Sequence, residues 1–250
     1  NGCNYNKILE EFILSIYKGL SDSNSKYFLD KTPRYYLIIE EISKIFPKAK
    51  FIFLFRNPLS QFASKMHRHQ GRFRTLYSAF VDLRKGPNLL ASGHEKLRDR
   101  SIKITYHELV NNSQRVIKKL ERYLDIRIHE SIVNDLSSIN IGGSMGDPKL
   151  MSGKSSKISI NSIDKWKKVF NTPLRRIIAV RYLKGIHENY FDALGISREH
   201  IIKELKMIKI KYFSNLKDYF HIICYLIITR FKIYLIFGKK RKWTKDLFLD

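Results

Sequence analysis

A short run of consecutive apolar residues, KFIFLF at residues 50–55, is the feature that most constrains the fold of this chain. A continuous apolar run of this length suits a strand that is covered on both faces, as in a parallel sheet. It ends on Arg56-Asn57-Pro58, and the following residues, LSQFASKMHRH, have a helical pattern. Asn57 suits the N-cap of that helix and Pro58 its first position. We therefore expect a buried parallel strand followed directly by a helix.

Two further segments indicate the same alternation of strand and helix. KYFLDKTPRYY, residues 26–36, is interpreted as a strand, a sharp turn and a helix. In that interpretation Lys31 lies at the carboxyl end of the strand, Thr32 is the N-cap and Pro33 begins the helix. SIKITY, residues 101–106, alternates well enough for another strand. Strands that alternate with helices favour an α/β fold with a parallel sheet.

Apolar periodicity predicts helices in several other parts of the chain. One expected helix ends near Gly19, and a long one is opened by Thr172-Pro173 and closed near Gly195. Residues 140–161 are rich in Gly, Ser and Lys without an apolar period, so we expect a loop there. The expected helices cover residues 8–20, 113–124, 162–170, 172–194 and 197–213.

The overall charge of the chain narrows the classes of partner. The 250 residues carry a formal charge of +24, from 47 basic and 23 acidic residues. Such an excess predicts attraction to polyanions, phosphorylated cofactors, sulfated or acidic substrates, or anionic membrane, without choosing among them. An apolar fraction of 44% permits a real core, and two cysteines give neither a disulfide framework nor a zinc spacing. No signal peptide is recognisable at the start.

Basic and hydroxyl side chains gather at two of the predicted strand ends. Lys31 lies beside the free N–H groups of a predicted helix, and Arg56 ends the apolar strand. Ser60, Ser64 and Arg68 follow at spacings of four, so they share one helix face. A guanidinium, hydroxyl groups and a helix N-terminus together suit a phosphate monoester. A capped turn and a solvated basic helix remain the alternative interpretation.

The order of these segments resembles that of the sulfotransferase family. DKTPRYY, FPKAKFIFLFRNPLSQFAS, ITYHELV and then a Ser/Gly/Lys loop leading to DKWKK follow the family's order and approximate spacing over roughly residues 25–195. The pattern is closer to the carbohydrate, tyrosyl-protein and bacterial branches than to the cytosolic small-molecule branch. The resemblance implies a P-loop-NTPase-like three-layer sandwich, with a parallel central sheet flanked by helices. It also implies transfer of a sulfuryl group from 3′-phosphoadenosine 5′-phosphosulfate (PAPS) to a hydroxyl or amine, without a metal.

The resemblance also implies roles for particular residues. Lys31 would contact the phosphosulfate and stabilise charge on the leaving phosphate. Arg56 and Ser64 would bind the 3′-phosphate, with Arg68 in support, and Tyr106 would pack near the adenine. The product nucleotide would be 3′-phosphoadenosine 5′-phosphate (PAP). The acceptor stays open among a sugar, a lipid, a protein tyrosine and a small alcohol.

The resemblance implies that a later loop closes over the nucleotide. It also implies a phosphosulfate-binding loop, which this sequence lacks. The closing residues implied by the resemblance are Lys154, Ser155, Ser156 and Lys165. The Gly- and Ser/Thr-rich loop of form GxxRSGTT, which cradles the 5′-phosphosulfate, has no counterpart here, and no general base is identified. We therefore expect either a chain that lacks its N-terminal part or a degenerate relative, and activity of this chain alone is in question.

The end of the chain differs in composition from the rest. We expect residues 1–200 to form an N-terminally incomplete sulfotransferase-like domain, and residues 201–250 a basic, apolar helical extension. Residues 219–242 are apolar but contain Arg230 and Lys232, which argues against a membrane-spanning helix. Peripheral contact with an anionic membrane and packing onto the sheet both stay open. A cytoplasmic or membrane-associated location is favoured.

The rival class is a basic module that binds nucleic acid or another polyanion without catalysis. The charge and the 14 Tyr and 16 Phe residues permit such a module. However, the aromatic residues lie mostly inside apolar runs, where core packing explains them. No helix-turn-helix, zinc or RNA-recognition signature is visible. Nucleic acid is therefore disfavoured as a partner.

Overall fold

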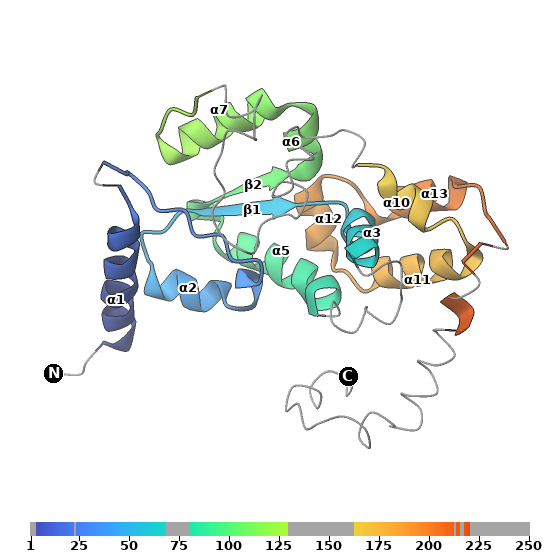
Figure 1. Cartoon of the computed structure of the whole chain (residues 1–250), viewed down its shortest axis with the longest axis horizontal. Coiled ribbons are helices and arrows are strands. Elements are labelled where there is room, and N and C mark those ends of the chain that lie inside the picture. Colours follow the sequence, from blue (N-terminus) through green and yellow to red (C-terminus); the bar gives the residue numbers. More distant parts are fainter. Residues whose placement is uncertain are drawn as a thin grey trace, which may run out of the picture.

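A pair of parallel strands lies at the centre of the structure, a computed structural model that describes residues 4–22, 24–68, 81–129, 163–212, 214–215 and 218–220. Strand β1 (Phe51–Phe55) pairs with β2 (Ser101–Thr105) in the described part of the chain. The register sets Phe51 opposite Ser101 and Phe55 opposite Thr105. The two predicted parallel strands at these positions are confirmed (Figure 1).

Helices make up most of the remaining described structure. Short elements precede or follow them: 3₁₀ turns η1 (Tyr35–Leu37) and η4 (Arg98–Arg100), and the π-helical turn η3 (Val81–Lys85). The α-helices are α1 (Tyr5–Leu20), α2 (Ile39–Ile45), α3 (Pro58–Arg68), α5 (Gly86–Lys96), α6 (Tyr106–Asn111), α7 (Ser113–Leu124), α10 (Lys165–Val169), α11 (Pro173–Lys184), α12 (Glu188–Leu194) and α13 (Arg198–Met207).

The sheet is covered differently on its two faces. Helices α6 and α7 lie on one side of it and α2 and α5 on the other (Figure 1). Phe53 and Phe55 point into the main core, where they are buried. Ile52 and Leu54, on the opposite face of β1, keep 40% and 49% of their surface exposed. The expectation that both faces of this strand are covered is therefore wrong for the described residues.

The segment around Lys31 is not a strand that leads into a helix. Tyr27, Phe28 and Leu29 are exposed by 42%, 40% and 79%, and residues 26–31 pair with neither strand. The ring of Phe28 stacks on Tyr17 of α1, with 4.1 Å between centroids. This contact holds the segment against α1 rather than against the sheet, which explains why the predicted strand does not form.

The turn after Lys31 is held by polar contacts instead of a helix N-terminus. The Asp30 carboxylate accepts hydrogen bonds from the hydroxyls of Tyr17 and Tyr35 and, at 3.2 Å, from that of Thr32. A turn and η1 follow, and α2 begins only at Ile39. The prediction that Thr32 and Pro33 open an α-helix is therefore wrong.

Several predicted helices are confirmed, and one is divided. The Asn57 side chain caps α3, since its Oδ1 accepts from the Leu59 N–H at 2.9 Å. The helix predicted over residues 172–194 is interrupted after Lys184. There the Asn88 amide donates to the Gly185 carbonyl at 3.3 Å and its oxygen accepts from the His187 N–H at 2.9 Å. Helix α5, which carries Asn88, was not predicted.

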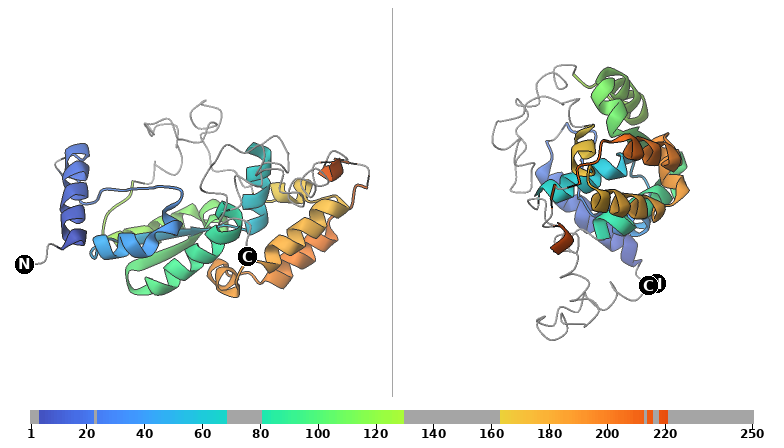
Figure 2. Two further views of the ribbon diagram at one scale, coloured as in Figure 1. Left: turned by 90° about the horizontal axis from the view of Figure 1, so that it is seen from below. Right: turned by 90° about the vertical axis from the view of Figure 1, so that its right-hand side faces the viewer.

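The C-terminal elements share the core with the sheet. Helices α11 and α13 lie side by side (Figure 2), and Ile201 and Leu205 of α13 are fully buried. Arg175 forms a buried, two-pronged ion pair with Asp218, at 2.5 and 3.1 Å. The helix predicted to reach residue 213 ends at Met207. The proposed division of the chain at residue 200 stays a prediction.

Most of the apolar tail, residues 221–250, lies outside the described residues. In the described ranges, no helix combines the length and the apolarity needed to cross a membrane. The prediction of membrane contact through residues 219–242 therefore stays a prediction.

A close helix contact gives a test of this packing. A Cβ atom added to Gly93 of α5 would lie 2.6 Å from Cδ1 and 3.0 Å from Cγ2 of the buried Ile39. Alanine normally favours a helix over glycine by about 0.5–1 kcal/mol, but overpacking a core costs about 1–3 kcal/mol. We expect Gly93→Ala to lower the free energy of unfolding, measured by urea denaturation. Gly19→Ala, with nothing within 4 Å, is the control and should be neutral or stabilising; stabilisation of both variants would contradict the packing described.

Candidate functional site

The strand register brings two predicted cofactor residues together. Because Phe55 faces Thr105, the next residues along the two strands, Arg56 and Tyr106, emerge at the same edge of the sheet. The Arg56 guanidinium lies over the Tyr106 ring, with its carbon 4.2 Å from the ring centroid. Partial burial lowers the pKa of Arg56, while Tyr106 and Tyr190 act in the opposite direction. An arginine stays protonated at neutral pH, so this edge presents an oriented positive charge.

The backbone of Arg56 is fixed by residues that sequence reasoning missed. The hydroxyl of Tyr190, in α12, donates to the Arg56 carbonyl at 2.7 Å. The amide of Gln61, in α3, donates to the same Tyr190 oxygen at 2.8 Å. Tyr190 is fully buried, and this burial raises its pKa to about 12, so it remains a hydrogen-bond donor at neutral pH. The strand end is thus held in place from two helices.

The start of α3 joins the strand end to α10. Ser60 is buried and its hydroxyl donates to the Ile163 carbonyl at 3.1 Å. Lys165 begins α10 two residues later and is exposed. One turn along α3, Ser64 is exposed. The hydroxyl of Ser64 and the ammonium of Lys165 therefore come from two helices that pack against each other near Arg56.

For the other predicted site residues, the structure shows no hydrogen bond or ion pair with Arg56 or Tyr106, or does not describe the side chain. Arg68 is the last residue of α3, and its side chain lies outside the described residues. Lys154, Ser155 and Ser156 also lie outside them. Lys31 is exposed, and its side chain forms no hydrogen bond or ion pair with any described residue.

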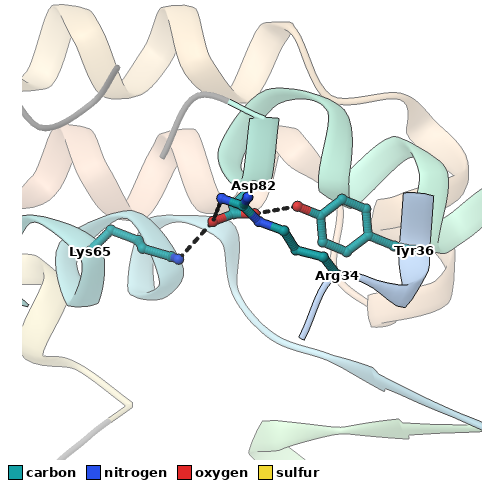
Figure 3. Close-up of polar contacts among 4 residues, drawn as sticks. All are labelled: Arg34, Tyr36, Lys65 and Asp82. Atoms are coloured by element: carbon teal, nitrogen blue, oxygen red, sulfur yellow. Dashed lines mark hydrogen bonds and ion pairs between the residues drawn. The ribbon is translucent and has the colours of Figure 1, made fainter. Parts of the chain in front are cut away.

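An acidic residue organises the segment that follows Lys31. Asp82, in η3, accepts from Arg34 Nε and from Lys65 Nζ, each at 2.9 Å, and from the Tyr36 hydroxyl (Figure 3). Burial alone would raise the pKa of Asp82, but the hydrogen bonds from Arg34, Tyr36 and Lys65 outweigh it, and the pKa is lowered. Asp82 is therefore ionised at neutral pH and ties the segment after Lys31 to α3.

A cavity of about 650 Å³ opens beside this cluster. It is lined by the segment that follows Lys31, by helix α3 and by the start of α5, and Leu54 of β1 also lines it. Its wall is partly charged and partly apolar. The lining residues are Thr32, Pro33, Arg34, Tyr36, Leu54, Gln61, Lys65, Asp82, Leu83, Gly86, Pro87, Leu90 and Tyr190.

The missed residues had weak sequence signals. Asp82 is an isolated acid beside basic residues, which is a signal for an ion pair. It also stands just before Gly86-Pro87, a pair that is typical of a helix start. Tyr190 sits within a helical apolar pattern that core packing explains equally well. Only the fold brings it to Arg56.

The ion pairs of Asp82 predict a pH-dependent contribution to stability. The folded-state pKa of Asp82 lies below its unfolded value of about 3.9. The stabilisation is therefore fully present above the unfolded pKa and is lost as the pH falls through the folded pKa. We expect Asp82→Asn to lower the free energy of unfolding at pH 7, by about 1–3 kcal/mol for a partly buried carboxylate that loses charged partners.

The difference between Asp82→Asn and the native chain should shrink at pH 3, measured by urea denaturation at pH 7, 5 and 3. Asp99→Asn is the matched control, because Asp99 is exposed and forms no hydrogen bond or ion pair with described residues. A cost for Asp82→Asn that is the same at all three pH values would exclude the ionised carboxylate as its source.

Comparison with known proteins identifies the family of the chain. The family model described as the sulfotransferase family matches residues 5–130, half of the chain. The match includes Lys31, Arg56, Ser64 and Tyr106. No curated protein and no solved structure gave a significant match. By the extent of its match to the family model, the chain belongs to the sulfotransferase family.

Proposed function

We propose that this chain transfers the sulfuryl group of PAPS to a hydroxyl or amine acceptor, on a P-loop-NTPase-like fold. The observation that carries the proposal is the Arg56 guanidinium held over Tyr106 at the carboxyl end of β1. In open α/β sheets, ligands bind at this edge. Family membership supports the use of PAPS, since sulfotransferases in general use it.

The donor groups at this edge fit the 3′-phosphate of the nucleotide. Arg56 supplies a forked, charged donor and Ser64 an exposed hydroxyl, with Arg68 at the end of the same helix. The capped N-terminus of α3 adds a favourable potential for an anion. Tyr106 would pack near the adenine. Lys165, with Lys154, Ser155 and Ser156, would close over the nucleotide.

Lys31 would act on the reaction itself. When bound, PAPS would supply the sulfuryl group: the bond to the leaving phosphate would break as a bond to the acceptor oxygen or nitrogen forms, and the acceptor would release its proton. Charge develops on that phosphate, and a cation placed beside it stabilises the transition state more than the ground state. Asp82 does not serve as the general base in this scheme, because three donors already occupy its two oxygens.

Arg56 gives the first test, because binding can be measured without turnover. We expect PAP to bind saturably and more tightly than ATP in calorimetric titrations at two salt concentrations. Arg56→Ala should weaken PAP by roughly 10-fold to 100-fold, since a hydrogen bond to a charged group contributes about 1.5–3 kcal/mol. Arg181→Ala removes an exposed arginine of α11 and should change little. If the native and Arg56→Ala chains bind PAP with equal affinity, Arg56 does not contribute to the nucleotide site.

Lys31 gives the second test, in a preparation that turns over PAPS. Lys31→Ala should lower kcat by about 100-fold or more, as losing a donor to a developing charge does in other enzymes. Its PAP affinity should stay within a few-fold of the native value, because the role assigned to Lys31 is realised in the transition state. Steady-state kinetics and calorimetry on the same sample separate the two effects. Unchanged kcat would refute the assignment.

A further inference from the structure

A line of positive charge runs along the outer face of α7. Lys118, Lys119 and Arg122 lie three, four and seven residues after Arg115, so the four cations share one face of the helix. At 1.5 Å per residue, the line is about 10 Å long. Arg115, Lys118 and Arg122 are exposed. Glycan or phosphate chains that repeat an anionic group match such a row of cations.

The row borders a groove rather than a flat surface. The four cations line a cavity of about 780 Å³ together with Glu108, Asn112, Gln114 and Tyr123. Among the described residues, an acid pairs with only one of the four cations: Lys119 lies 3.9 Å from Glu108, and it also donates to the Lys103 carbonyl at 2.7 Å. Within the described ranges, Arg115, Lys118 and Arg122 form no ion pair. Three exposed charges in one groove are thus left for a partner.

We propose that this groove on α7 is a docking surface for an acidic polysaccharide. Its cations match carboxylate or sulfate groups that repeat along a linear chain. In the same groove, the Gln114 amide provides a hydrogen-bond donor for sugar hydroxyls, and the Glu108 carboxylate provides an acceptor. A carboxylate among the cations suits a ligand that carries hydroxyls as well as negative charge.

Two other anionic partners fit the groove less well. Binding to a flat bilayer uses exposed apolar side chains beside the cations, whereas α7 buries Val116 toward the sheet. Sequence-tolerant binding of single-stranded nucleic acid uses aromatic rings on which bases stack. The ring at this groove, Tyr123, is covered by Lys50 at 5.3 Å, and its hydroxyl donates to the Arg100 carbonyl at 2.5 Å.

The position of the groove relates it to the strand edge described above. Helix α6 begins at Tyr106, and Glu108 of the same helix already lines the groove. A polysaccharide bound along α7 would therefore also reach α6, the helix that begins at Tyr106. Binding of the polysaccharide can be measured without sulfuryl transfer. A failure of this inference can therefore be distinguished from a failure of the proposed function.

The test compares two variants that lose the same positive charge from different surfaces of the full chain. One is Arg115→Gln/Lys118→Gln/Arg122→Gln. The control is Arg181→Gln/Lys184→Gln/Lys203→Gln, which removes exposed cations from α11 and α13. The probe is a size-defined oligouronate, with a neutral dextran oligomer of equal length. Affinity is measured by calorimetry at several salt concentrations, after unfolding curves have shown that both variants fold.

We expect the α7 variant to bind the oligouronate at least 10-fold more weakly, with a shallower salt dependence, and the control to stay within about 2-fold of the native chain. Arg115→Lys/Arg122→Lys keeps the charge and should keep most of the binding; if it loses as much as the α7 variant, charge docking is refuted. Equal losses in the two charge-removal variants would overturn the proposal in favour of non-specific attraction. An α7 variant that loses binding to a single-stranded oligonucleotide or to anionic vesicles, but not to the oligouronate, would also overturn it.

Discussion

The register between β1 and β2 is the constraint on which the rest of the structure depends. An isolated pair of strands is marginal in water, so this pair relies on the core beneath Phe53 and Phe55. Since Phe55 pairs with Thr105, Arg56 and Tyr106 leave the sheet together. A slip of one residue would turn Phe53 and Phe55 away from the core and separate the arginine from its ring. The same packing that stabilises the fold therefore sets the geometry of the candidate site.

The few acidic residues of this basic chain act as ties between segments. Asp82 joins Arg34 and Tyr36 to Lys65 of α3, and Asp218 pairs with the buried Arg175. Removing one partner of a buried pair leaves the other charge without compensation, which is costly. The 23 acids are outnumbered by 47 bases, and Arg115, Lys118 and Arg122 of α7 form no ion pair with the described residues.

Apolar runs and helix caps in the sequence were enough to predict the elements that depend on neighbouring residues alone. The apolar run of β1, the Asn57 cap and the start of α7 were all readable from neighbouring residues. The strand assigned to residues 26–30 failed because its apolar residues have a competing partner, Tyr17, that periodicity does not reveal.

The parts of the site that sequence reasoning missed come from distant segments. Tyr190 reaches the Arg56 carbonyl across 134 positions of the chain, and Asp82 reaches Tyr36 across 46. Helix α5 begins with Gly86-Pro87 and contains Gly93, residues that lower helix propensity. Its stability comes from burial of Gly86, Pro87, Ala91 and Gly93 against other elements. Such tertiary effects override local preference.

The stacking of Arg56 on Tyr106 has a consequence for the entropy of binding. A free arginine loses up to about 2 kcal/mol of rotamer entropy when a ligand immobilises it. Arg56 is already confined between a ring and a fixed backbone, so little of that loss remains for an arriving anion. Lys31 is exposed, and its side chain forms no hydrogen bond or ion pair with the described residues, so under the proposed function it would have to be ordered when the ligand arrives. If the proposed function holds, the affinity for the nucleotide would come mainly from the confined arginine, and the exposed lysine would bear the entropic cost of forming the reactive complex.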